Sequence, residues 1–180
     1  MLDIFKKDLY RYYGDKGESI KDRILRPSEL KYIYCMRAAH LTKNPLARVW
    51  YKLRLRKISS KTNIQIPAVT KIGEGFYIGH TGRIIVNSKT IIGKNCNIAT
   101  GVTLGAESRG TRQGAPTLGD EVWVGTNAVI VGHVTVGSDV LIAPGAFVNF
   151  DVPPHSIVIG NPGKIIPREN ATDGYINKKV

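Results

Sequence analysis

Four histidines are the side chains of this sequence best suited to proton transfer near neutral pH: His40, His80, His133 and His155. His80 stands out because it lies in the turn-like stretch YIGHTG, directly after a glycine. A hydroxyl has a pKa far above 7, so such a base could take its proton as the oxygen attacks an acyl group. Alternatively, His80 is only a polar residue on a turn. For the other three histidines we expect surface or packing roles.

The elements that position His80 are set by an aliphatic residue that returns every six positions. A period of six fits neither a helix, at about 3.6 residues per turn, nor a half-buried strand, which alternates every two. It fits a coil with three flat faces, each a short strand and a turn, whose aliphatic side chains stack inside one prism. The sequence therefore predicts a mainly β fold, a hexapeptide-repeat parallel β-helix. The repeating positions are Ile66, Ile72, Ile78, Ile84, Val86, Ile92, Ile98, Leu104, Leu118, Val124, Ile130, Val136, Ile142 and Val148.

Small residues support this prediction. Glycine or alanine usually follows the repeating aliphatic residue, and the fourth position after it is compact, as at Cys96 and Ala128. The repeat has two irregularities: a slip of two positions from Ile84 to Val86, and a polar segment over Ala106–Pro116 that must leave the core as a loop. Insertions in such coils form loops on one face, often the binding face, so both irregularities are candidates for a site.

The region before the repeat is basic and helical. Residues 2–14 and 28–58 are predicted to be helices, the second broken at Pro45, with an apolar side packed on the start of the coil. Residues 1–62 hold 16 of the 26 Lys and Arg but 6 of the 14 Asp and Glu. The basic run of the second helix could attract an anionic acceptor, a membrane surface or a nucleic acid, or it could be a solvated helical face. Nucleic acid is the least favoured partner, since no nucleic-acid-binding module accompanies the charge. The run is Arg48, Lys52, Arg54, Arg56, Lys57 and Lys61.

Length and composition predict one domain with an appendage. We expect a basic helical region over residues 1–62, the coil over 63–168 with a loop at 106–117, and a C-terminal tail over 169–180. The sequence has no run of eighteen apolar residues and no signal-like stretch. Its two cysteines, Cys35 and Cys96, make no disulfide framework, so a cytoplasmic location is expected.

Three segments resemble the left-handed β-helix acyltransferases, most closely the serine acetyltransferase-like branch that includes capsule and colanic-acid acetyltransferases. The resemblance covers roughly residues 5–168, including the helices. It implies a left-handed coil, acetyl-CoA as the donor substrate, and a homotrimer with active sites at the clefts between subunits. The segments are IPAVTKIGEGFYIGHTGRIIVNSKTIIGKNCNIATGVTLGAESRG, LGDEVWVGTNAVIVGHVTVGSDVLIAPGAFV and DVPPHSIVIGNPGKII.

By this resemblance, His80 matches the family's catalytic histidine, which takes the proton from the acceptor hydroxyl. Gly79 stands where serine acetyltransferases have an aspartate before that histidine. Gln65 stands where they have the aspartate that orients it, so Gln65 is expected to orient His80 as a neutral amide. In the loop, Arg112 and Gln113 represent an Arg-His pair of the family.

The acceptor site implied by the resemblance departs further from serine acetyltransferases, because Ser88 replaces a family glutamate. Gln65 and the Val86-Asn87 pair are similar to the colanic-acid-type members, which acetylate sugar hydroxyls. We therefore expect an O-acetyltransferase acting on a sugar or cell-surface polysaccharide precursor. The alternatives are a serine O-acetyltransferase of cysteine biosynthesis and a non-catalytic or metal-hydrolytic β-helix protein. The residues expected at the acceptor are Asp15, Gly79, Asn87, Ser88 and Gln113.

The resemblance places the donor in a groove between adjacent coils, where small residues permit close approach of the pantetheine arm. Cations would meet the phosphates and the adenosine end. Trp123 is expected to be either a wall for the donor or a packing residue between subunits. The sequence has no His-x4-His pair of the kind found in the metal-dependent carbonic anhydrases of this coil, so no metal is expected. The donor residues are Thr103, Gly105, Ala106, Arg112, Gly125, Ala143, Lys164 and Arg168.

Overall fold

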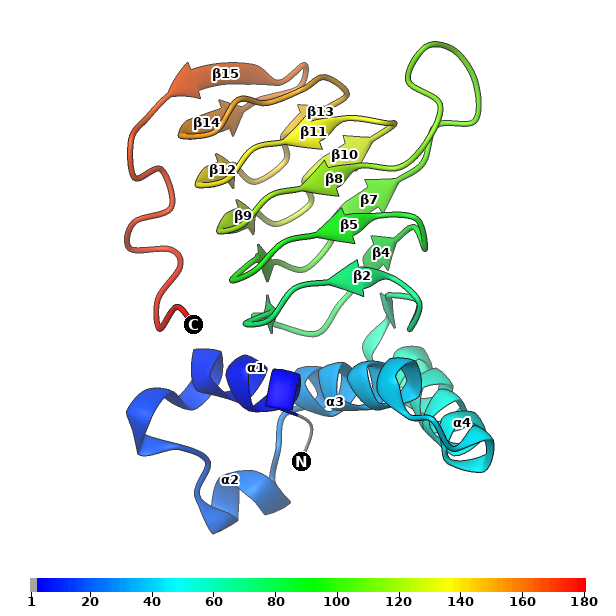
Figure 1. Ribbon diagram of the computed structural model, residues 1–180. Helices are drawn as coiled ribbons and strands as arrows, with labels where there is room; N and C mark the ends of the chain where they lie inside the picture. The colour runs from blue at the N-terminus through cyan, green and yellow to red at the C-terminus, as the bar shows by residue number, and fades with distance from the viewer. Residues whose placement is uncertain (1–2) are drawn as a thin grey trace.

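A computed structural model describes residues 3–180 of the chain. In this range a layer of helices lies below a coil of short strands that winds away from it (Figure 1). The predicted mainly β coil with a short helical N-terminal segment is confirmed. The helices are α1 (Asp3–Tyr13), the 3-10 helix η1 (Gly14–Lys16), α2 (Ile20–Ile24), α3 (Ser28–Leu41) and α4 (Pro45–Thr62).

The helices agree with the predicted ones over most of their length. Residue 2 of the predicted first helix lies outside the described residues. The predicted break at Pro45 is confirmed, because Asn44 caps the N-terminus of α4 by accepting hydrogen bonds from Leu46 N and Ala47 N. The short helix α2 has no apolar repeat that would have predicted it. It begins at a capping box between Ser19 and Asp22.

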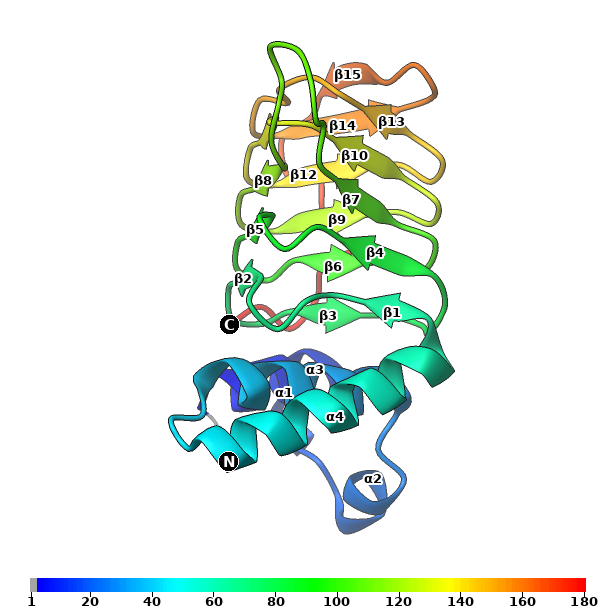
Figure 2. The same ribbon diagram turned by 90° about the vertical axis from the view of Figure 1, so that its right-hand side faces the viewer.

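The strands form three sheets that make the faces of a prism (Figure 2). Sheet A contains β1 (Ile64–Gln65), β4 (Ile84–Val86), β7 (Thr103–Gly105), β10 (Val129–Val131) and β13 (Phe147–Val148). Sheet B contains β2 (Lys71–Ile72), β5 (Ile91–Ile92), β8 (Thr117–Leu118) and β11 (Thr135–Val136). Sheet C contains β3 (Tyr77–Ile78), β6 (Asn97–Ile98), β9 (Val122–Val124), β12 (Val140–Ile142), β14 (Ser156–Ile159) and the antiparallel β15 (Lys164–Pro167).

The register shows where the repeat is interrupted. A regular coil takes three hexapeptides, as between the paired residues Val129 and Phe147. Ile64 pairs with Ile84 one coil later, two residues more than the regular spacing, so the extra residues lie before Ile84. The sequence placed this slip between Ile84 and Val86. The structure corrects it: the two additional residues lie in the turn 79–83, which contains His80.

The interior of the prism is filled by the predicted aliphatic column, whose members are at most 9% exposed. The corner between sheets B and C requires glycine. A Cβ on Gly73 would lie 2.6 Å from the backbone of Gly93, and a Cβ on Gly93 would lie 2.3 Å from the carbonyl oxygen of Gly119. Gly119 and Gly137 are equally crowded by the coil above. The glycine after the aliphatic residue therefore lets consecutive coils approach at this corner.

The helices cap the open end of the prism with two tyrosines. The Tyr32 hydroxyl donates to the carbonyl of Ile66 at 2.9 Å and accepts from its N–H at 2.8 Å. Tyr12 makes the same pair of hydrogen bonds with Ile78 on sheet C. Burial raises the pKa of Tyr12 well above its usual value, so the hydroxyl stays neutral and can both donate and accept. The first coil thus leaves no strand edge open there.

An ion pair from two helices caps sheet B. Arg37 of α3 donates to Asp8 of α1 through Nε at 3.0 Å and Nη2 at 3.1 Å. The same guanidinium donates to the carbonyls of Ile72 and Gly73, and Asp8 accepts from Phe76 N. The Asp8 side chain is fully buried, and that of Arg37 is nearly so. This cluster fixes α1 and α3 to the coil.

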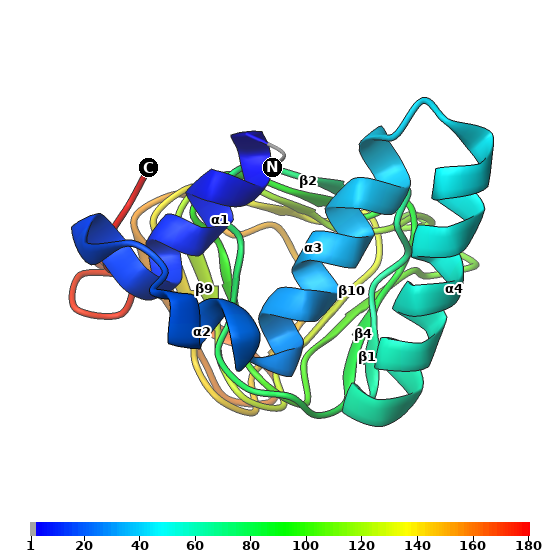
Figure 3. The ribbon, with the colours of Figure 1, turned by 90° about the horizontal axis from the view of Figure 1, so that it is seen from below.

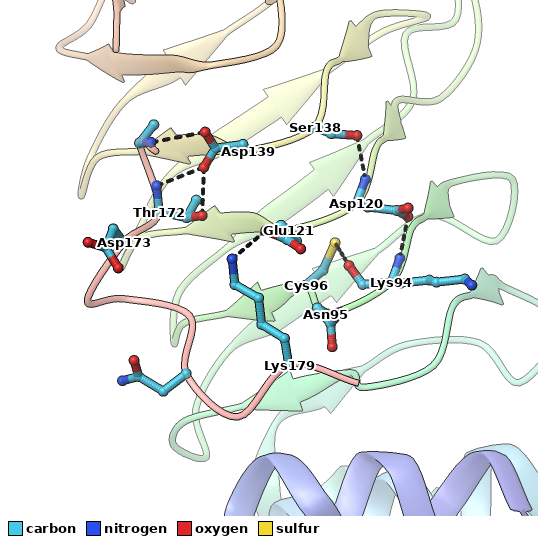
Figure 4. Close-up of polar contacts among 12 residues, drawn as sticks. Lys94, Asn95, Cys96, Asp120, Glu121, Ser138, Asp139, Thr172, Asp173 and Lys179 are labelled. Carbon is cyan, nitrogen blue, oxygen red and sulfur yellow. Dashed lines mark hydrogen bonds and ion pairs between the residues drawn. The ribbon is translucent and has the colours of Figure 1, made fainter. Parts of the chain in front are cut away.

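The C-terminal tail runs back along the prism to the helical layer (Figure 1). Its anchor is Asp139, which accepts from Ala171 N and from the N–H and hydroxyl of Thr172 (Figure 4). Further along, Lys179 pairs with Glu121. Tyr175 packs on Trp123 with ring centroids 4.9 Å apart. This chain's own tail thus covers part of the Trp123 ring, and the two roles expected of its side chain stay predictions.

His155 makes this anchor depend on pH. Its hydrogen bond with Asp139, at 2.9 Å, and then the charge of Glu169 raise the pKa of His155. A raised folded-state pKa means that the stabilisation is complete below about 6.5 and is lost as the pH rises through the folded value. We expect proteolytic cleavage within residues 168–180 to accelerate above neutral pH. The measurement is the cleavage rate of the unchanged chain divided by that of His155→Asn at each pH, which removes the pH dependence of the protease itself. A ratio that does not change with pH contradicts the prediction.

Candidate active site at the corners of the coil

His80 lies at the corner where sheet C passes to sheet A. Ile78 before it is buried, and His80 itself is exposed. The turn 79–83 is held from below, because Gly82 N donates to Thr62 O at 2.9 Å and Ile84 N to Asn63 O at 3.2 Å. Gly82 has φ +136°, and a Cβ there would lie 2.0 Å from Thr100 Oγ1. The two extra residues therefore raise a turn on the prism surface with His80 at its side.

Gln65 lies on the outward side of β1 in sheet A, two residues after Asn63. It follows Thr62 and Asn63, which hold the His80 turn, and it pairs with Ile85 on sheet A. Its exposed side chain lines an open groove of about 350 Å³ between α4 and sheet A. Within residues 3–180, neither His80 nor Gln65 makes a side-chain hydrogen bond. The orientation of His80 by Gln65 therefore stays a prediction.

The loop after β7 lies at a different corner, between sheets A and B. Glu107 and Gly114 exchange two backbone hydrogen bonds, which fold the loop as a hairpin that rises beside the upper coils (Figure 2). Arg112 O accepts from His133 N at 2.8 Å, and Arg112 pairs with Asp151 at 3.4 Å. The hydrogen bond that Asp151 accepts from Thr135 N lowers the pKa of Asp151, and the positive charge of Arg112 lowers it further. Ala106 begins this hairpin and is exposed.

The predicted acceptor residues are divided between these places. Gly79 lies beside His80, with no atom closer than 3.6 Å to a Cβ built on it. Asn87, Ser88 and Gln113 lie at the corner between sheets A and B, across sheet A from His80. Asp15 lies in η1, after α1, and is exposed. Within one chain, the structure therefore does not assemble the predicted acceptor site.

A column of small residues runs up the prism from the His80 corner. Gly79, Ala99, Gly125 and Ala143 each follow the inward aliphatic residue of a sheet C strand in successive coils. Coils of parallel strands stack about 4.8 Å apart, so this column forms a continuous shallow track. A Cβ on Gly125 would lie 2.7 Å from Pro144 N, so the track cannot carry a larger side chain there.

Thr103 and Gly105 lie apart from this track, on the outward side of sheet A. The outward side of β7 pairs with Val129 and Val131 of the coil above. A Cβ on Gly105 would lie 3.1 Å from the Val131 side chain. Gly105 therefore lies beside the hairpin, whereas Thr103 begins β7 next to the turn after Gly125, since its N–H donates to Ala128 O at 3.0 Å.

The three cations predicted for the donor phosphates lie at three different corners. Lys164 begins β15 opposite Ile159, at the upper end of the small-residue track. Arg168 lies across sheet C, where its N–H donates to His155 O. Arg112 is in the hairpin and is held by Asp151. One bound donor cannot meet all three within a single chain, and Lys164 is the cation that continues the track from His80.

Several residues that build this corner were missed by sequence reasoning. Thr62 and Asn63 hold the His80 turn through backbone carbonyls, which side-chain identity does not reveal. Asn63 adopts φ +58°, the left-handed conformation that ends α4. The asparagine before Ile64 is the one signal in the sequence that a helix ends there. Among residues 3–180, no three His, Cys, Asp or Glu side chains gather as a metal site.

Comparisons with known proteins find that this coil is similar to hexapeptide-repeat transferases. Residues 115–149 match the family model described as bacterial transferase hexapeptide (six repeats). Serine acetyltransferase 2 of Arabidopsis thaliana is 30% identical over 148 residues, covering 82% of this chain and 46% of that protein. The serine acetyltransferase of Bacillus subtilis is 32% identical over 145 residues, covering 79% of this chain and 66% of that protein. This chain is thus shorter than both relatives.

The solved structures give the same picture over more of the chain. The crystal structure of Neisseria gonorrhoeae serine acetyltransferase in complex with serine superposes with a TM-score of 0.73 and 27% identity. The match covers 91% of this chain and 67% of the other.

The prediction of a sugar or polysaccharide acceptor is therefore wrong, because the relatives in sequence and in fold are serine acetyltransferases. The departures at Gln65, Gly79 and Ser88 were given too much weight.

Proposed function

We propose that this chain is a hexapeptide-repeat serine O-acetyltransferase with acetyl-CoA as donor. The observation that carries the proposal is the position of His80. It is an exposed base on the two-residue expansion of the coil, at the foot of the small-residue track. The serine acetyltransferases that resemble the chain in sequence and fold support serine as the acceptor.

In the proposed reaction, His80 takes the proton of the serine hydroxyl as its oxygen attacks the thioester carbonyl of acetyl-CoA. The tetrahedral intermediate collapses with cleavage of the C–S bond. The coenzyme A sulfur leaves and receives the proton back from the imidazolium. Gln65 of β1 is the proposed orienting residue, since an amide oxygen can accept from the ring N–H of His80.

The track from Gly79 to Ala143 is the proposed path of the pantetheine arm, with Lys164 at the phosphate end. Small residues allow an extended chain to lie against the backbone, and an ammonium group suits phosphate. Of the other predicted residues, Asn87, Ser88, Arg112 and Gln113 lie at the hairpin corner of the chain. We therefore propose that a second copy, in a homotrimer, brings its Arg112 and Gln113 to the His80 corner. This arrangement would unite both halves of the site.

The proposal is tested by thiol release from acetyl-CoA with L-serine, with D-serine and glucose as control acceptors. O-acetylserine should appear by mass spectrometry in proportion to the thiol released. Turnover that needs L-serine and fails with both controls supports the proposal. Thiol release that is the same with no acceptor, or with glucose, contradicts it.

Gly79 offers a direct prediction about the acceptor. The family resemblance has an aspartate here, and the Cβ position is open, with its nearest neighbour 3.6 Å away on Tyr77. We expect Gly79→Asp to fold normally and to raise kcat/KM for L-serine about tenfold, because a carboxylate can bind the serine ammonium. Gly79→Asn is the matched control for size without charge. An equal gain in both variants, or a loss in the aspartate variant, contradicts the prediction.

A further inference from the structure

The α4 helix carries an apolar stripe on the side that faces away from the protein. The stripe consists of Leu46, Val49, Trp50 and Leu53, which are 81%, 55%, 50% and 61% exposed. Their spacing places them on one side of the helix. The apolar side of this helix that was expected to pack on the coil therefore does not include Trp50 and Leu53. Apolar residues of the opposite side, with Leu55 the most buried, make the contacts with the rest of the molecule.

Cations flank this stripe on both sides. The α4 sequence PLARVWYKLRLRKISSKT contains six Lys and Arg and no Asp or Glu. Among residues 3–180, no carboxylate pairs with any of these six cations. Arg48 donates to the carbonyl of Thr42, and the Arg54 guanidinium lies 4.8 Å from the centre of the Trp50 ring. The outward surface of α4 is thus apolar along its axis and positively charged along its margins.

The position of α4 leaves that surface accessible. Figure 3 shows α4 at the outer edge of the helical layer, beside α3 and away from α1. The helix has 18 residues, so it extends about 27 Å. It is convex and rod-like, and its outward side is not part of a groove that a folded-in segment could fill. Long basic side chains beside the stripe can keep their charges in water while their methylene stems lie on an apolar surface.

Charge decides among the possible occupants. A second copy of α4 against the first would bring two sets of six cations together, which like-charge repulsion disfavours. A nucleic acid would neutralise the cations but would leave Leu46, Val49 and Leu53 without an apolar partner. An anionic bilayer supplies both parts: headgroup charge for the margins and an acyl boundary for the stripe. Trp50 at the edge of the stripe has the amphipathic ring that such interfaces favour.

We propose that α4 is an interfacial helix that docks this protein, parallel to the surface, on a bilayer containing anionic phospholipids. No helix within residues 3–180 is long and apolar enough to cross a membrane. The contact would therefore be peripheral. The inference does not depend on acetyl transfer, since it uses no residue of the proposed active site.

The test is flotation of the full chain with phosphatidylcholine vesicles that contain or lack phosphatidylglycerol. We expect binding to the anionic vesicles, a blue shift of the Trp50 emission, and weaker binding at high salt. Leu53→Ser should lower the apparent affinity about tenfold through lost apolar burial. Lys57→Glu should lower it about tenfold through reversed charge. Trp50→Phe identifies which tryptophan gives the spectral change.

Matched controls lie elsewhere on the surface. Val69→Ser removes a side chain that is 62% exposed, against 61% for Leu53, and Lys89→Glu reverses an exposed charge on the coil. Both should bind anionic vesicles as the unchanged chain does. Equal binding to neutral vesicles, or no effect of the two α4 variants, overturns the proposal. A changed molecular mass of Leu53→Ser in light scattering overturns it in favour of a contact between copies. The proposal is also overturned, in favour of nucleic acid, if the unchanged chain binds RNA but not vesicles. In that case Lys57→Glu should lose RNA binding and Leu53→Ser should keep it.

Discussion

Replacing His80 with alanine should lower kcat for acetyl transfer to L-serine by about 10²- to 10⁴-fold, the usual contribution of a general base. The KM for acetyl-CoA should change little, because the loss affects the transition state and not donor binding. The physical reason is position. His80 is exposed on a turn that is held by backbone hydrogen bonds from Gly82 and Ile84, so its side chain supports no core contact. Steady-state kinetics of the purified variant measure both constants.

The control for this prediction is His133→Ala. His133 is also exposed on a coil turn, but it lies at the hairpin corner of its own chain. His133→Ala should keep most of the activity. The urea midpoint of His80→Ala should match that of the unchanged protein. Light scattering should give the proposed mass of three chains for both variants and for the unchanged protein. If His80→Ala keeps full activity and His133→Ala loses it, then His80 is not the general base and His133 takes that role.

Replacing Asp8 with alanine should lower the free energy of unfolding by about 3–5 kcal/mol, the usual cost of removing one partner from a buried ion pair. The variant leaves the Arg37 guanidinium beneath the coil without its carboxylate, and it leaves Phe76 N without an acceptor. Both donors stay buried, so water cannot replace the lost hydrogen bonds at no cost. Urea unfolding at fixed protein concentration, followed by circular dichroism, measures the change.

Asp3→Ala on the same helix is the matched control, because Asp3 is exposed and forms a surface ion pair with Lys6. Its urea midpoint should equal that of the unchanged chain. The double variant Asp8→Ala/Arg37→Met should recover part of the lost stability, since it removes the uncompensated charge. If Asp3→Ala and Asp8→Ala unfold alike, the ion pair does not fix the helices to the coil.

The sequence predicted the coil well because the information is local and repeated. Each inward position, such as Ile92 or Ile130, is aliphatic for the same reason, and on sheet B the glycine after it, as at Gly73 and Gly93, meets similar crowding in successive coils. Many weak indications of one period add up to one fold. Pro45 with its asparagine cap likewise defined the start of α4 from neighbouring residues alone.

The choice of acceptor was where sequence reasoning failed. Single departures at Gly79 and Ser88 were set against an overall likeness to serine acetyltransferases, and the relatives support serine. A missing carboxylate at one position does not define the remaining pocket, because other side chains can supply charge once the chain is folded. Asp15 was expected at the acceptor from the resemblance alone, and the structure places it, exposed, in η1 after α1.

By itself, the sequence determined the mainly β coil, the helical segment before it, the hairpin insertion and the identity of the one histidine beside an irregular turn. Only the tertiary structure decided which corner of the prism each of these occupies. A six-residue period specifies which side chains point inward, but it does not specify which turn absorbs two extra residues or how far around the prism a later segment lies. Those depend on strand pairing between coils, such as Ile64 with Ile84, and this pairing places His80 and Gln113 on opposite sides of sheet A.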